Sequence, residues 1–139
     1  MQQFQTRLDI RTQGQGLIEF TRDVEHWVDD CAIENGLLTV YCAHTSASLI
    51  IQENADPDVQ YDLQVFFKRL VREDPSLYRH TCEGPDDMPA HIRAALTNVS
   101  LSIPVANGRA VLGTWQGIYL FEHRAIPHRR QVHLHLIGQ

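Results

Sequence analysis

Long hydrophobic runs are absent from this sequence. Its 139 residues contain no apolar segment of 18 residues, the length that a membrane-spanning helix needs. The N-terminal segment also lacks the apolar core of a signal peptide. The sequence therefore predicts a cytoplasmic protein that does not associate with a membrane.

Cysteine is scarce, and the three cysteines do not form a recognisable framework. Cys31, Cys42 and Cys82 are odd in number and lack the paired spacing of a metal knuckle. Free thiols of this kind suit a reducing compartment. Cys82 stands two residues after His80, but no oxyanion donor is evident near it. A cysteine nucleophile is therefore disfavoured, and the role of Cys82 stays open.

An excess of basic residues is missing as well. The formal net charge is −5, whereas general nucleic-acid-binding proteins normally have a basic face. The Gly-x-Ser-x-Gly motif, the Walker loop and the dinucleotide fingerprint do not occur. The sequence thus argues against a nucleic-acid partner and against several common enzyme classes. Arg124, Arg129 and Arg130 could still supply a local basic pocket.

The hydrophobic pattern that is present predicts one α+β domain covering residues 1–139. This length suits a single domain. Alternating apolar and polar residues predict strands, and spacings of three and four residues predict about three helices. The helices are expected to cover one face of a mostly antiparallel sheet, in a sandwich-like or barrel-like arrangement. The expected strands are residues 4–10, 17–20, 37–43, 49–51, 99–103, 109–114, 118–121 and 131–137. The first expected helix has Thr21 as its N-cap and ends at Asn35-Gly36, and the other two begin at Asp56-Pro57 and Ala90.

The stretch from Cys42 to Asp58 holds the densest group of candidate site residues. Short polar side chains precede an aliphatic run at residues 49–51, and acids and amides follow it. Small hydroxyls and backbone N–H groups can cradle a phosphate, and carboxylates can hold a cation. The alternative is a Ser/Thr-rich turn followed by a helix cap. The candidates are His44, Thr45, Ser46, Ser48, Glu53 and Asn54.

A long polar loop between His80 and His91 is the second candidate region. A loop of this length without obvious structure is uncommon unless it has a function. If it folds back towards His44, three imidazoles and a water molecule would form an open zinc site. Asp86 and Asp87 would then support the histidines or bind magnesium. The alternative is that Asp87 caps the following helix and His91 is exposed.

Two further runs near the C-terminus carry candidate residues. Trp115 lies between glycines, so it is either a core anchor or a stacking wall for a ring, and Gln116 could recognise a heteroatom. His123 and Arg124 end a predicted strand, where they suit either anion recognition or a surface salt-bridge cluster.

His133 and His135 share one face of the last predicted strand. Such a pair can chelate zinc if a third ligand arrives. The alternative is a pair of exposed polar residues on a half-buried strand. The role of this pair stays open.

These motifs resemble the YjbQ-like family over essentially the whole chain. The resemblance implies a compact α+β domain that assembles as a homotrimer, with metal or anions bound near the His-Thr-Ser-Ala-Ser segment and the acidic loop. Members look like weak thiamine-phosphate synthases, which join hydroxymethylpyrimidine diphosphate to thiazole phosphate and release diphosphate. The matching segments are His44 to Leu49, Glu53 to Pro57, Glu83 to Ile92, Ile103 to Val105 with Gly108-Arg109, Gly113 to Ile118, and Glu122 to Arg124.

The resemblance also implies roles for individual residues. Its motif histidines fall on His44, His80 and His91, which would hold a divalent metal, zinc rather than magnesium because imidazoles dominate. The cation or Arg124 would offset charge on the departing diphosphate. The expected catalytic residues are His44, Glu53, Asp87 and His123, and the expected substrate-binding residues are Thr45, Ser46, Ser48, Asn54, Trp115 (as a wall for the pyrimidine), Gln116 and Arg124. The alternatives are a metal-assisted hydrolase and a non-enzymatic trimer that binds a small phosphorylated ligand.

Overall fold

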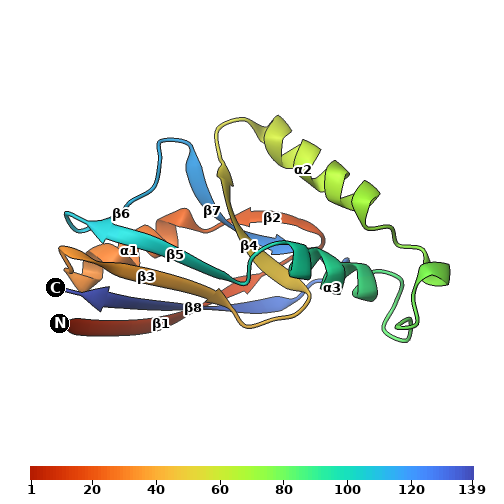
Figure 1. Cartoon of the computed structure of the whole chain (residues 1–139), viewed down its shortest axis with the longest axis horizontal. Helices are drawn as coiled ribbons and strands as arrows, with labels where there is room; N and C mark the ends of the chain where they lie inside the picture. Colours follow the sequence, from red (N-terminus) through yellow and green to blue (C-terminus); the bar gives the residue numbers. More distant parts are fainter.

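The computed structural model describes all residues, 1–139, and shows an α+β protein with three α-helices (Figure 1). Every pairing between its strands is antiparallel. The predicted fold class is therefore confirmed. The strands are β1 (Gln2–Arg11), β2 (Gly16–Glu19), β3 (Asn35–Cys42), β4 (Ala47–Glu53), β5 (Ser100–Ala106), β6 (Arg109–Ala110), β7 (Gln116–Glu122) and β8 (Arg129–Gly138); the helices are α1 (Thr21–Cys31), α2 (Pro57–Leu70) and α3 (Asp87–Leu96), with a short 3-10 turn at Pro75–Leu77.

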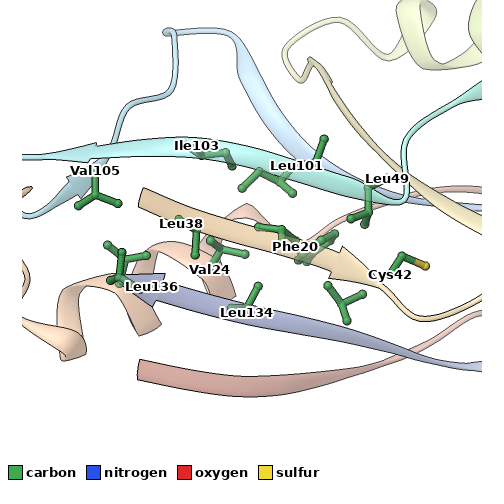
Figure 2. Close-up of a cluster of buried hydrophobic side chains, with 14 of the residues drawn as sticks. Phe20, Val24, Leu38, Cys42, Leu49, Leu101, Ile103, Val105, Leu134 and Leu136 are labelled. Atoms are coloured by element: carbon green, nitrogen blue, oxygen red, sulfur yellow. The ribbon is translucent and has the colours of Figure 1, made fainter. Parts of the chain in front are cut away.

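The strands form two sheets. The larger sheet has the order β1-β8-β3-β5-β6, and the smaller has the order β2-β7-β4. Alternate residues of β3, β5 and β8 point inward, as the period of two in their sequences predicts. Figure 2 shows these side chains gathered into one core, with Leu38, Ile103 and Leu134 near Val24 of α1.

Helix α1 starts and ends differently from the prediction. Phe20, and not Thr21, occupies the N-cap position. The Thr21 hydroxyl instead accepts the Ile118 N–H at 2.9 Å, which ties α1 to β7. At the other end the helix stops at Ala32, which has a left-handed backbone with φ of 52°. The predicted stop at Asn35-Gly36 was wrong because these residues begin β3.

Gly36 is required in β3 for a packing reason. It pairs with Gly138 of β8, and a Cβ atom at Gly36 would collide with the Ile137 carbonyl oxygen. The glycine signal therefore marks a close approach of two strands and not the end of a helix.

Helix α2 begins as predicted, with Pro57 in its first turn and the Asp56 side chain accepting the Asp58 N–H at 2.9 Å. None of its residues is buried, and it stands at the edge of the molecule (Figure 1). Phe66 and Leu70 of this helix are each 56% exposed. No helix in the structure combines the length and apolar character needed to cross a membrane.

Two other boundaries affect the site. Helix α3 begins at Asp87, three residues before the predicted start at Ala90. The predicted strand at 109–114 is paired only at residues 109–110, so residues 111–115 form a loop that leads into β7.

Candidate functional site

Four side chains that can bind a cation meet where the polar loop joins α3. One ligand atom from each of His80, Glu83, Asp87 and His91 lies within 4.8 Å of the others. Asp87 is central, because its Oδ2 lies 2.6 Å from His80 Nε2 and 3.1 Å from His91 Nε2. Glu83 Oε2 is 3.1 Å from the same His80 nitrogen. Two imidazoles and two carboxylates form a donor set that zinc accepts, and we call these four residues the cation cluster.

The contacts of His91 leave a position between His91 and Asp87 that a proton or a cation can fill. Asp87 and His91 are four residues apart on α3 and therefore share one face. His91 Nδ1 lies 2.9 Å from the Thr45 carbonyl oxygen, which can only accept, so Nδ1 carries a proton. The Nε2 atom of a neutral ring then presents its lone pair to the Asp87 carboxylate. A proton or a metal ion between the two groups relieves this conflict, and a metal ion satisfies the other ligands as well.

Arg124 holds the carboxylates of this region in place. Its guanidinium donates to Asp86 Oδ2 at 3.0 Å, to Asp87 Oδ1 at 2.6 Å and to the Glu83 carbonyl oxygen at 3.0 Å. Burial acts to raise the pKa of Asp87, but the hydrogen bond with His80 and the charge of Arg124 lower it overall. The same hydrogen bond raises the pKa of His80. Asp87 is thus a carboxylate, and Arg124 acts by positioning it.

His44 does not join the cation cluster within one chain. Its Nε2 accepts the Gln131 N–H at 2.7 Å, and its Nδ1 lies 3.5 Å from Arg130 Nη1. Burial, and then the charge of Arg130, lower the pKa of His44, so the ring is neutral. The structure therefore brings together two of the three predicted histidine ligands, His80 and His91, and adds two carboxylates in place of the third.

Several other predicted site residues lie at the far end of the smaller sheet. Ala47 pairs with Glu122 at the end near the cation cluster, whereas Glu53 pairs with Gln116 at the opposite end. The seven residues of β4 span about 20 Å at the usual rise of a strand. A small molecule bound at the cluster therefore does not reach Trp115 or Gln116 of the same chain.

The contacts at this far end are mainly structural. Glu53 Oε2 accepts the Asp56 N–H at 2.9 Å and so fixes the turn before α2. Asn54 Nδ2 donates to Glu19 Oε2 at 3.2 Å. Trp115 is 61% exposed and is not a core anchor. Asn54 and Gln116 line an open cleft of 710 Å³ between α1 and the loop before β7.

Three predicted site residues are buried inside the chain. Ser48 and His123 are 0% and 1% exposed, and Ser48 Oγ lies 2.8 Å from His123 Nε2 and 2.6 Å from Thr97 Oγ1. Ser46 Oγ accepts a hydrogen bond from Arg130 Nη2 at 3.0 Å. In this chain these side chains make internal hydrogen bonds and are not open to a substrate.

The C-terminal arginines do not form the local basic pocket that their spacing suggested. Arg130 is 4% exposed and pairs with Glu122. Arg129 pairs with Asp9 on the surface at 2.6 Å, and Arg124 is held by the acidic loop. That prediction was wrong because each arginine has its own carboxylate partner.

The remaining candidates, His133, His135 and Cys82, lie outside the cation cluster. His135 Nε2 contacts Gln3 Oε1 at 3.1 Å across the β1–β8 pair. Neither His133 nor His135 belongs to a group of three possible metal ligands. Cys82 is exposed and is not disulfide-bonded.

The sequence analysis missed Glu83 as a member of the cation cluster and missed the central position of Asp87 in it. The signal was present in two spacings, His80 to Glu83 and Asp87 to His91. The second places both side chains on one face only if the helix already includes Asp87. Because the helix was expected to begin at Ala90, this pair was not recognised.

Buried His123 is expected to make the protein less stable in mild acid. Burial, and then the charge of Arg93, lower the pKa of His123 to about 3. Between that value and about 6.5 the unfolded chain binds a proton at this residue and the folded chain does not, so stability falls as the pH falls. Between pH 6.5 and pH 5 the free energy of unfolding is expected to fall by about 2 kcal/mol. Urea unfolding across this range measures it.

The matched control for this prediction is His123→Gln, which keeps a polar group beside Ser48 but does not titrate. Its free energy of unfolding should depend less on pH than that of the unchanged protein, although His44 contributes in the same direction. Identical slopes in the two proteins would show that His123 is not the group responsible.

Residues 6–139 match the family described as UPF0047 protein YjbQ-like. A UPF0047 protein of Synechocystis is 56% identical over 137 residues, which cover 99% of this chain and 93% of the relative. The UPF0047 protein YjbQ of Escherichia coli is 39% identical, with coverage of 98% and 99%. A crystal structure of a protein of unknown function from Sulfolobus solfataricus has the same fold, with a TM-score of 0.87 at 23% identity, covering 99% of this chain and 100% of that one.

Proposed function

The chain belongs to the UPF0047 family of YjbQ-like proteins, and we propose that it is a metal-dependent enzyme that acts on a small phosphorylated substrate. The observation that carries this proposal is the cation cluster, in which four possible ligand atoms lie within 4.8 Å of one another. Zinc suits the cluster better than magnesium, because magnesium prefers oxygen ligands and two of these groups are imidazoles.

The side chains of the cation cluster differ in how firmly their contacts hold them. The Asp87 side chain is 3% exposed and is fixed by Arg124, and His91 is fixed by the Thr45 carbonyl. The Glu83 side chain is 62% exposed. Asp87, His80 and His91 would therefore hold the ion, and Glu83 can leave the ion to accept a proton from a reacting group. A bound cation would supply positive charge to offset the charge of a leaving phosphate or diphosphate.

Two reactions fit this arrangement. The first is the one that the family resemblance implies: the methylene carbon of hydroxymethylpyrimidine diphosphate forms a bond to the thiazole nitrogen while its bond to diphosphate breaks. The second is hydrolysis, in which water takes the place of the thiazole. The exposed Glu83 carboxylate favours the second, because it can accept the proton of an attacking water. So does the length of β4, about 20 Å, because the cluster lies near one end of this strand and the predicted pyrimidine wall at Trp115 lies near the other.

The test is turnover by zinc-loaded protein of hydroxymethylpyrimidine diphosphate, with and without thiazole phosphate. Thiamine phosphate formed only with both substrates supports the synthase, and diphosphate or phosphate released from the first substrate alone supports the hydrolase. Asp87→Asn should remove either activity, whereas Asp9→Asn, the same change at a surface ion pair, should not. No turnover in either assay would favour the non-enzymatic, ligand-binding alternative.

Assembly and location remain predictions. The exposed Tyr61, Phe66 and Leu70 of α2 give apolar surface that a homotrimer would cover. Sedimentation equilibrium should then give three times the mass of the chain. A cytoplasmic location is supported by the three free cysteines, and fractionation of the native host tests it.

A further inference from the structure

We infer that the cavity between the end of α2, α3 and the loop before β2 binds a phosphate-type oxyanion. The cavity has a volume of 350 Å³ and no hydrophobic lining residue. We call it the basic cavity. Its lining residues are Gln15, Lys68, Arg72, Glu73 and Arg93.

The charges around the basic cavity are not balanced within the chain. Three cationic side chains line it, against the single carboxylate of Glu73. That carboxylate accepts a hydrogen bond from Gln15 Nε2 at 2.7 Å and lies 3.7 Å from Arg93 Nη1. Lys68 and Arg72 take part in none of the ion pairs of the structure. The cavity therefore has an excess of positive charge that an anion would neutralise.

Arg93 adds a buried positive charge to the wall of the basic cavity. It is 3% exposed, and its Nη2 donates to the Val71 carbonyl oxygen at 2.7 Å. Its Nε is buried and has no hydrogen-bond partner. A buried cationic group with an unused N–H is costly unless it is paired. Burial also lowers the pKa of Arg93, which agrees with a guanidinium whose charge is incompletely matched.

The side chains select the class of ligand. A guanidinium presents a planar fork that matches two oxygens of a phosphate, and a lysine adds a point charge. Lys68 lies in the last turn of α2 and Arg72 follows the end of this helix, and both line the basic cavity. The lack of apolar lining disfavours an aromatic or aliphatic ligand. A compact, multiply charged oxyanion fits these donors best.

The basic cavity is separate from the cation cluster. Arg93 and His91 are two residues apart on α3, which places them on different sides of the helix, about 200° apart. The adjacent residues Arg124 and His123 likewise make contacts on different sides of the chain. Arg124 contacts Asp87 of the cluster, whereas His123 accepts a hydrogen bond from Gln15 through its carbonyl oxygen at 3.2 Å. The inference therefore does not depend on the proposed enzyme activity.

The experiment is calorimetric titration with inorganic phosphate at constant ionic strength. We expect saturable binding to the unchanged protein, weakened about tenfold or more by Lys68→Gln and by Arg72→Gln, since each removes a charge-assisted hydrogen bond. Arg69→Gln is the matched control, because Arg69 is exposed on the same helix but does not line the cavity. Its affinity for phosphate should change little.

Two further variants make the result decisive. Arg93→Lys keeps the charge but removes the planar guanidinium fork, so it should weaken phosphate binding. In metal-free protein, His80→Ala in the cation cluster should leave phosphate binding unchanged. The inference is overturned if phosphate shows no saturable binding, if Arg69→Gln loses as much affinity as Arg72→Gln, or if acetate binds as tightly as phosphate.

Discussion

Asp87→Asn is expected to abolish tight zinc binding. Asp87 lies between both imidazoles of the cation cluster, 2.6 Å from His80 Nε2 and 3.1 Å from His91 Nε2. Loss of a residue that only supports a metal ligand costs about 10-fold to 100-fold in affinity, so loss of the central carboxylate should cost about 100-fold or more. Competition with a coloured chelator, on protein without a His tag, measures this affinity.

The controls for this prediction use the other histidines. His91→Ala should weaken zinc binding as much as Asp87→Asn does. Because this variant keeps the contact between Arg124 and Asp87, a loss of affinity would come from the missing metal ligand and not from a disturbed loop. His44→Ala and His133→Ala should leave zinc affinity unchanged, because neither side chain belongs to the cluster. An equal loss in His44→Ala would contradict the four-residue cluster and return His44 to the ligand set.

Arg130→Met is expected to destabilise the protein by about 3–5 kcal/mol, because it leaves a buried carboxylate without its partner. Arg130 Nε donates to Glu122 Oε2 at 2.7 Å, and Glu122 is fully buried. Burial acts to raise the pKa of Glu122, but the hydrogen bond from Arg130 lowers it overall. The ion pair therefore stabilises the folded protein at pH 7. This stabilisation is lost as the pH falls below the ordinary pKa range of a glutamate.

The matched control is Arg129→Met, one residue earlier in β8. Arg129 pairs with Asp9 on the surface, where its side chain is 59% exposed. Such pairs contribute about 0–1 kcal/mol. Urea unfolding at pH 7 compares the two variants, and similar small losses in both would show that the buried pair is not a major source of stability.

Local patterns in the sequence were enough to predict the elements of the fold. Alternation in β1, β5 and β8, and the stripe of Val24, Val28 and Cys31 in α1, reflect the side that each element turns to the core. The helix ends were less predictable because their signals have tertiary causes. Thr21 bonds to a strand nearly a hundred residues later, and Gly36 is fixed by contact with Gly138.

The candidate site was predicted only in part, because some of its contacts are local in the sequence and others depend on distant strands. His80 and His91 flank one loop, so their approach is a nearly local event. His44 is directed elsewhere by the Gln131 N–H of a distant strand, which no spacing in the sequence reveals. The Gly-Thr-Trp-Gln run was assigned to the same pocket, yet the direction of β7 carries it to the opposite end of the sheet.

The position of β8 in the larger sheet has a consequence for how the chain folds. β8 is the last strand in the sequence but lies between β1 and β3, and β1 pairs with no other strand. While the chain is being synthesised, β1 therefore leaves the ribosome long before its partner exists, with Phe4, Leu8 and Ile10 uncovered. Closure of the sheet joins β1 to β8, which are far apart in the sequence, and such an arrangement of high contact order slows folding.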